Sequence, residues 1–171
     1  MNQIVEKTAP VYCETYPKWV IISRWIILTL ALALGIYILL DIQPMLGIIY
    51  AVCSLIALTL VLPLSRCVYC YYHGKLCNTG WGKIAAYLYA KGDESLYVER
   101  YNYAILLHLL WIVPLLAFLF QLVRNKELRY AVVFLAYILI LWMEKVILKK
   151  LACQRCQQRE FCPALPFRKA R

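Results

Sequence analysis

The sequence is short of charged residues, and of acidic residues above all. Charged side chains make up 16% of its 171 residues, with 9 Asp and Glu against 19 Lys and Arg. A soluble globular domain carries about 25% charged residues. Here 64% of the residues are hydrophobic and the mean hydropathy is +0.66. The composition excludes an ordinary soluble domain.

The chain also lacks the common patterns of catalysis. It has no Ser-His-Asp set, no pair of carboxylates spaced for acid-base chemistry and no glycine-rich phosphate loop, and it holds only two histidines. Heptad repeats and low-complexity tracts are missing as well. Enzymatic activity is therefore uncertain from the sequence, and an oxidoreductase is the class to expect if there is any.

What the chain has instead is long apolar runs. A helix needs about 20 mostly apolar residues to cross the hydrocarbon core of a bilayer. Four runs meet that length: 19–40, 45–64, 103–123, which contains a kinking Pro114, and 130–148. They predict an all-α integral membrane protein with four transmembrane helices. The connections "DIQP" and "RNKELR" are short, which predicts two antiparallel hairpins in a single domain over residues 1–171.

The basic residues predict the orientation of these hairpins. All but three of the 19 Lys and Arg lie in the segments joined to the end with both chain termini, and the exceptions are Arg124, Lys126 and Arg129. Positive residues accumulate on the cytoplasmic side of membrane proteins. Both termini are therefore predicted to be cytoplasmic, together with a cap formed by residues 65–102 and 149–171.

The formal net charge of +10 follows from this topology and from attraction to anionic lipid head groups. The expected partners are the lipid bilayer and either another membrane protein or a cytoplasmic protein. No nucleic-acid role is needed to explain the charge. Within the loop, residues 84–91 followed by Gly92 predict a short helix along the membrane surface.

Two cysteine clusters stand out within the predicted cap. "CVYCYYHGKLC" covers residues 67–77 and "CQRCQQREFC" covers residues 153–162, so each holds a Cys-x2-Cys pair and a third cysteine. The cytosol keeps thiols reduced, and cysteine clusters there are more often metal-binding than disulfide-bonded. The predicted metal ligands are Cys67, Cys70, Cys77, Cys153, Cys156 and Cys162. A structural zinc cap for partner or lipid interaction is the function we expect.

Three ligand arrangements fit this spacing. The two pairs, Cys67 with Cys70 and Cys153 with Cys156, would complete one four-thiolate zinc site. Six thiolates would share two zinc ions, a spacing that resembles the fungal binuclear zinc-cluster modules. An iron-sulfur cluster would take four of the six, and the Cys162-Pro163 ending resembles that of bacterial ferredoxins.

A redox role is the alternative function. A four-helix membrane protein of 20.0 kDa with paired cysteines is similar in outline to the disulfide-forming quinone oxidoreductases. In that family the reactive cysteines follow the first and third helices, whereas here the clusters follow the second and fourth. The alternative is thus a membrane electron-transfer or thiol-redox component that uses an iron-sulfur cluster or a dithiol with a quinone.

Three ionisable residues interrupt the apolar runs. Arg24, His108 and Glu144 each lie five or six residues inside a predicted span, which places them about 7 to 9 Å below the cytoplasmic interface. One interpretation is a shared polar pocket for a head group, a quinone or a proton. The simpler one, which we favour, is that Arg24 extends to the interface and Glu144 pairs with Lys145 or with a neighbouring loop.

The two remaining cysteines are expected to lie outside the metal site. Cys53 lies midway along the second run and Cys13 precedes the first. A metal transporter would need further ligands through the middle of the bilayer, where Cys53 stands almost alone. That shortage argues against transport.

Overall fold

The computed structural model describes residues 12–160 and 162, so the predictions for residues 1–11 and for the tail 163–171 fall outside the described part. Within it the chain is all-α and contains no strand. The four main helices are α1 (Lys18–Ile42), α2 (Pro44–Ile56), α5 (Leu109–Asn125) and α6 (Leu128–Ile147). Two short helices, α3 (Trp81–Leu88) and α4 (Tyr97–Tyr101), lie between α2 and α5.

Further helical turns lengthen three of the main helices. They are η1 (Ala57–Val61) and η2 (Pro63–Cys67) after α2, η3 (Glu94–Leu96) and η4 (Asn102–His108) before α5, and η5 (Leu148–Ala152) and η6 (Cys153–Arg155) after α6. The resulting segments long and apolar enough to cross a membrane are Lys18–Ile42, Pro44–Cys67, Glu94–Asn125 and Leu128–Arg155. The four predicted runs are thereby confirmed as candidate spans.

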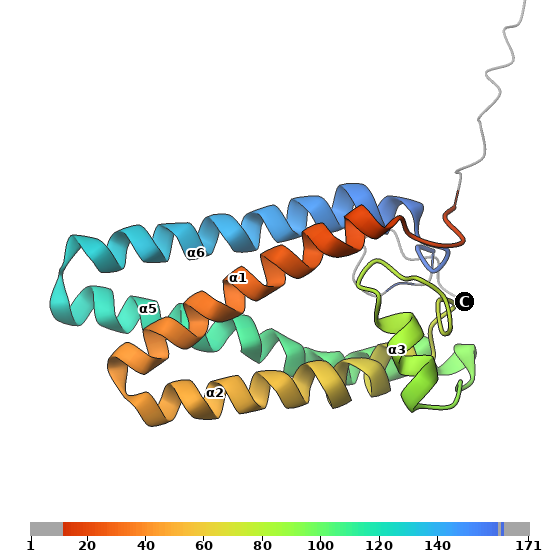
Figure 1. The fold of residues 1–171 in the computed structure, drawn as a ribbon, viewed down its shortest axis with the longest axis horizontal. Helices are drawn as coiled ribbons and strands as arrows, with labels where there is room; N and C mark the ends of the chain where they lie inside the picture. The colour runs from red at the N-terminus through yellow and green to blue at the C-terminus, as the bar shows by residue number, and fades with distance from the viewer. Residues whose placement is uncertain (1–11, 161, 163–171) are drawn as a thin grey trace, which may run out of the picture.

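The four long helices run side by side, and α1 crosses the bundle diagonally (Figure 1). It contacts each of the other three long helices. At one end of the bundle, the closed end, α1 and α2 are joined through Gln43 alone, and α5 and α6 through Lys126 and Glu127. The opposite end is the open end. Lys126 adopts φ 51 in the left-handed region, which ends α5 sharply. Both connections therefore force the antiparallel hairpins that the short loops predicted.

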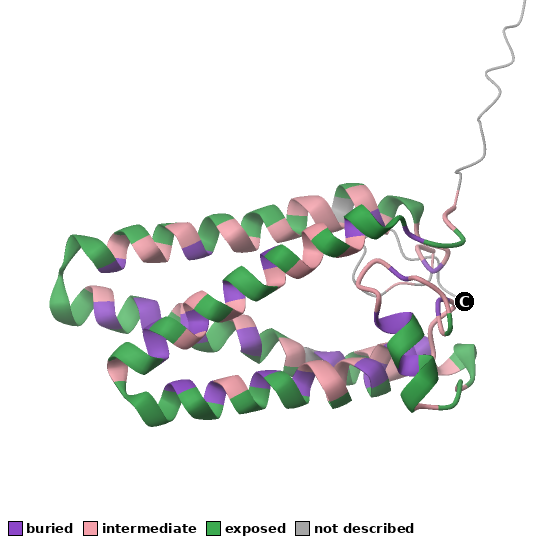
Figure 2. Cartoon of the chain, in the orientation of Figure 1, coloured by how far each residue is buried: buried purple, intermediate pink, exposed green. Residues whose placement is uncertain are grey.

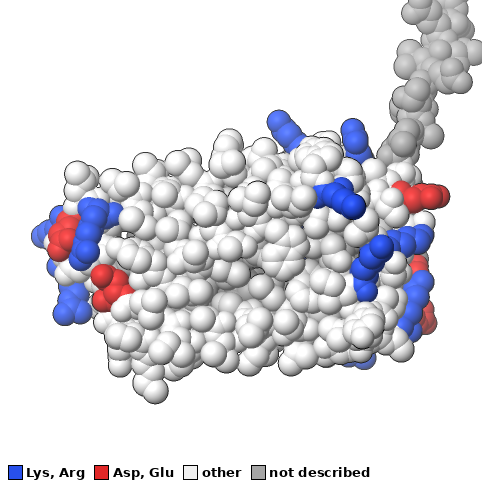
Figure 3. Space-filling model, viewed as in Figure 1, with Lys and Arg blue, Asp and Glu red and all other residues white. Residues whose placement is uncertain are grey.

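The outside of the bundle is apolar. Large exposed hydrophobic side chains follow all four long helices, among them Ile26, Leu55, Leu116 and Leu135, and buried positions face inward (Figure 2). On the face drawn in Figure 3, charged side chains gather at the two ends and leave an uncharged band between them. A surface of this size and kind needs apolar surroundings. The candidate spans therefore imply contact with a lipid bilayer.

A crossing point near the middle of the bundle depends on Gly35. A Cβ added there would lie 2.8 Å from Cγ of Pro114 and 3.0 Å from the hydroxyl oxygen of Tyr50. Proline donates no backbone hydrogen bond, so the carbonyl of Leu110, four residues earlier, loses its helical partner. The Tyr50 hydroxyl donates to that carbonyl at 2.7 Å. The proline that was predicted to kink the third span is therefore accommodated by a tyrosine from the other hairpin.

The surface helix differs from its prediction. It was expected over residues 84–91 with Gly92 as its stop, but α3 begins at Trp81 and ends at Leu88. Position 82 of this helix requires glycine, because an added Cβ would overlap the carbonyl oxygens of Tyr72 and Lys75. Gly92 instead donates its amide to the carbonyl of Val68 at 3.0 Å. The glycine that was expected to end the helix closes the loop onto the first cysteine cluster.

Candidate thiol site in the cap

The cap at the open end of the bundle is built from three segments that are distant in sequence. They are residues 12–17, residues 68–93 and residues 152–160 with Cys162, and they lie together at the same end of the helices (Figure 1). The amide of Cys13 donates to the carbonyl of Arg155 at 2.8 Å, and the amide of Tyr16 donates to the carbonyl of Leu76 at 2.9 Å. The N-terminal segment therefore bonds to both cluster-bearing segments, a role that the sequence did not predict.

Two buried tyrosines connect the same three segments. The Tyr72 hydroxyl donates to the carbonyl of Cys13 at 2.6 Å and accepts from the amide of Gln157 at 3.1 Å. The Tyr16 hydroxyl donates to the carbonyl of Ala152 at 2.7 Å. The two rings lie 5.4 Å apart between centroids. These bonds satisfy buried carbonyls where no regular secondary structure does so.

The first cluster is held against α3. The thiol sulfur of Cys77 accepts from the amide of Gly82 at 3.2 Å, and the Trp25 indole donates to the carbonyl of Thr79 at 2.9 Å. Cys67 and Cys77 are each only 8% exposed. The close approach at Gly82 and the indole bond from α1 therefore fix the position of the first cluster within the cap.

Each cluster contributes one half-buried cysteine, Cys70 or Cys156, to the same region of the cap. Both pack against the buried core of the cap, which contains Cys67 and Cys77. The Cys70 thiol donates to the side-chain oxygen of Gln158 at 3.0 Å, and it lies within electrostatic range of Cys156. Cysteines from both segments thus pack against one buried core.

Burial sets the protonation of these thiols. It raises the pKa of Cys70 to about 12, and the neighbouring Cys156 thiol opposes ionisation further. Burial also raises the pKa of Cys156, and it raises that of Tyr72 to about 12. Desolvation disfavours the charged form of each group. At neutral pH these thiols are therefore protonated unless a positive ligand compensates the charge.

A π-helical turn precedes each cluster. η2 ends at Cys67, and η5 ends immediately before Cys153. Such turns hydrogen-bond from residue i to i+5 and recur at functional sites. They repeat in both hairpins although the two sequences show no residue-level match. The signal lies in backbone geometry, so sequence reasoning did not find it.

The ligand set itself stays a prediction. Over residues 12–160 and Cys162, no three side chains of His, Cys, Asp or Glu stand close enough together to hold a metal ion. Cys53 is exposed on α2, as expected of a residue outside the site. Cys13, in contrast, packs against the core of the cap, and His73 contacts the carbonyl of Tyr89 at 3.1 Å.

The ionisable residues in the spans are partly brought together. Arg24 Nη2 lies 2.7 Å from Glu144 Oε1, with side chains 14% and 23% exposed. This ion pair joins α1 to α6, so our simpler interpretation, in which Arg24 extends to the interface and Glu144 pairs with Lys145 or a neighbouring loop, is wrong. Both partners also lie within electrostatic range of Cys153. His108 lies exposed at the end of η4.

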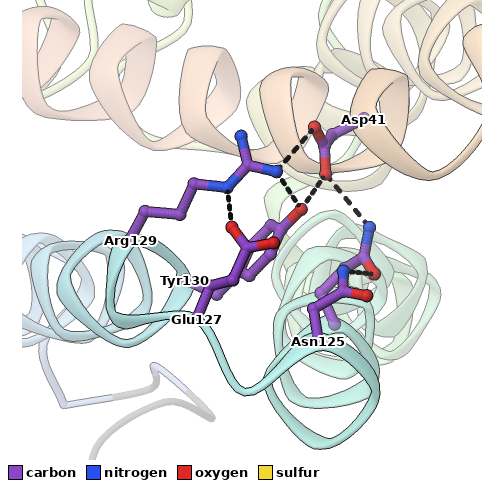
Figure 4. Close-up of polar contacts among 6 residues, drawn as sticks. Asp41, Asn125, Glu127, Arg129 and Tyr130 are labelled. Carbon is purple, nitrogen blue, oxygen red and sulfur yellow. Dashed lines mark hydrogen bonds and ion pairs between the residues drawn. The ribbon is translucent and has the colours of Figure 1, made fainter.

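A second polar cluster, at the closed end, was missed by sequence reasoning. Asp41 Oδ2 accepts from the Tyr130 hydroxyl at 2.7 Å and from the Gln121 amide at 3.1 Å (Figure 4). Arg129 Nη2 lies 4.0 Å from Asp41 Oδ1, and Arg129 Nε lies 2.7 Å from Glu127 Oε2. These contacts join α1, α5 and α6. No spacing pattern signals them, because Asp41 is 80 residues or more from Gln121 and Tyr130.

Comparisons of the chain with protein-family models, with curated proteins and with solved structures find no significant match. The functional argument therefore rests on the residues of this chain.

Proposed function

We propose that the chain is a small multi-pass membrane protein whose two cysteine clusters bind metal together and thereby lock a cap onto one end of a four-helix bundle. Structural zinc is the metal we favour. The observation that supports the proposal is that Cys70 and Cys156, one from each cluster, pack against the same buried core at the end to which the α5 and α6 hairpin returns.

The chemistry of the donors supports zinc. Thiolates are preferred zinc ligands, and four of them complete a structural site. Cys67, Cys70, Cys153 and Cys156 would form the four-thiolate arrangement, and Cys77 with Cys162 would extend it to six. Zinc deprotonates the thiols it binds, which compensates the buried charge that otherwise keeps Cys70 protonated. Binding would release protons and draw the ligands closer together.

The charge distribution supports a cytoplasmic position for this cap. Basic side chains stack on aromatic rings within the cap and next to it: Lys75 Nζ lies 3.9 Å from the centroid of the Tyr71 ring, and Arg66 Cζ lies 4.2 Å from that of Tyr101. Such a surface suits an acidic partner protein or anionic lipid. Holding this surface in one conformation is the role that we assign to the metal.

An iron-sulfur cluster bound by the same thiols is the alternative, with electron transfer to a membrane quinone as the function. A metal-free dithiol relay is less well supported. Thiol exchange needs a thiolate at the surface, whereas Cys67 is buried and burial holds the Cys70 thiol protonated.

Elemental analysis of anaerobically purified protein, with a visible spectrum of the same sample, tests the proposal. We expect about one or two zinc ions per chain and no colour. Cys70→Ser should lower the zinc content, and Cys53→Ser is the matched control that should not. Iron with acid-labile sulfide would contradict the zinc proposal and support the electron-transfer alternative. Protein without metal would overturn both.

A further inference from the structure

An open pocket lies at the junction between the apolar bundle and the cap. Its volume is about 200 Å³, and its lining residues are Val61, Leu64, Ser65, Arg100 and Tyr103. The lining therefore combines two apolar residues with a serine, an arginine and a tyrosine. This combination occurs where the second and third candidate spans approach each other.

The predicted ends of the apolar runs place the pocket at the depth of lipid head groups. The sequence places the end of the second apolar run at Leu64 and the start of the third at Tyr103, and both residues line the pocket. Leu64 is 48% exposed and Tyr103 is 57% exposed. A ligand that entered the pocket would therefore meet water on one side and acyl chains on the other.

Arg100, which lines the pocket, and Arg66, which follows the lining residue Ser65 in the chain, each hold a hydrogen-bond donor that no protein group accepts. The Nε atoms of Arg66 and Arg100 are buried and have no hydrogen-bond partner. Among the described residues, neither arginine is paired with a carboxylate. A buried donor without an acceptor is costly. The two guanidinium groups thus lack a hydrogen-bond acceptor at Nε and a carboxylate partner.

Aromatic rings hold these two side chains in place. Arg66 stacks on Tyr101, and Arg100 Cζ lies 5.8 Å from the centroids of both Tyr69 and Tyr103. Cation–π contacts of this kind restrict the guanidinium without neutralising it. Arg100 therefore lines the pocket with its charge unpaired by a carboxylate of the described residues.

We propose that this pocket binds the phosphate of an anionic phospholipid, with Arg100 as the main contact and the acyl chains lying along Val61 and Leu64. Guanidinium groups bind phosphate through paired charge-assisted hydrogen bonds. The pocket is smaller than the roughly 300 to 1,000 Å³ of a drug-sized ligand site, so it suits a head group whose chains remain outside in the bilayer. The inference does not depend on metal in the cap.

Native mass spectrometry of the full chain, titrated with phosphatidylglycerol or phosphatidylcholine in detergent, tests this site. Arg100→Gln should weaken the first phosphatidylglycerol bound by about tenfold or more, since it removes a charged hydrogen bond. Arg124→Gln is the matched control, because Arg124 is exposed at the opposite end of the bundle. It should leave the affinity unchanged. Arg100→Lys should restore part of it.

Equal affinity of Arg100→Gln and Arg124→Gln for phosphatidylglycerol would overturn the proposal. Displacement of the lipid by inorganic phosphate alone would assign the pocket to free phosphate and would overturn the lipid assignment. A second readout needs only the unaltered protein, because a bound ligand raises the unfolding temperature. Phosphatidylglycerol should raise it more than phosphatidylcholine does, and equal shifts would also contradict the inference.

Discussion

The two ends of the bundle are held together by different means. At the closed end the hairpins turn within one or two residues, and polar side chains around Asp41 join α1, α5 and α6 (Figure 4). At the cap end three separate segments meet, and buried thiols and tyrosines lie between them. The closed end is thus determined by short connections, whereas the cap end is determined by contacts between distant segments.

This difference indicates where an added cross-link has the greatest effect. Because its turns are short, the closed end loses little conformational entropy on folding, and its polar contacts need only select one packing arrangement of the helices. Residues 68–93 form a long connection that is costly to order. A metal shared by the two clusters would offset that cost at the end where chain entropy is largest. The cysteines occur at the end that needs such a cross-link.

Removal of the metal should therefore affect the two ends unequally, and this is the largest effect we expect. Treatment with a strong zinc chelator should speed amide hydrogen exchange in residues 68–93 by about a hundredfold or more, since structural zinc supplies folding energy outright. Exchange near Asp41 and Tyr130 should stay unchanged. Hydrogen exchange with mass spectrometry makes the comparison in one sample. Equal acceleration at both ends would contradict the proposed metal cross-link.

The fold was predictable because its signal is additive along the chain. Each span is a run of apolar residues, and a few misplaced residues in such a run do not erase it, so all four were found. The common depth of Arg24 and Glu144 followed from helical rise alone. Their pairing did not, because rise gives depth but not the rotation of one helix about its neighbour. That rotation is set by packing around residues such as Gly35.

The remaining features depend on tertiary contacts. Asp41 carries no local pattern, and its partners come from another hairpin. The π-helical turns that end at Cys67 and immediately before Cys153 are backbone conformations that no residue pattern in this sequence signals. The start of α3 depends on the close approach of Gly82 to Tyr72. In each case a contact between distant residues decides the local structure, and no local pattern in the sequence signals that contact.

Replacing the central acceptor of the closed end should have the second largest effect. Asp41→Ala leaves the Tyr130 hydroxyl and the Gln121 amide without their acceptor, and both residues are buried. We expect a loss of about 2 to 3 kcal/mol in the free energy of unfolding, since buried unpaired donors carry that cost. Unfolding in mixed micelles measures it. Metal content should stay unchanged, and a loss of zinc would show that the two ends are coupled.

The smallest effect should come from the exposed part of the same end. Glu127 and Arg129 form an ion pair at 2.7 Å, but their side chains are 52% and 54% exposed. Exposed pairs contribute at most about 1 kcal/mol and are screened by salt. Glu127→Gln should therefore lower the free energy of unfolding by less than about 1 kcal/mol, and high salt should abolish the difference. A loss as large as that of Asp41→Ala would mean that Glu127 holds Arg129 in the position where it contacts Asp41, so that the exposed pair and the buried acceptor act as one unit.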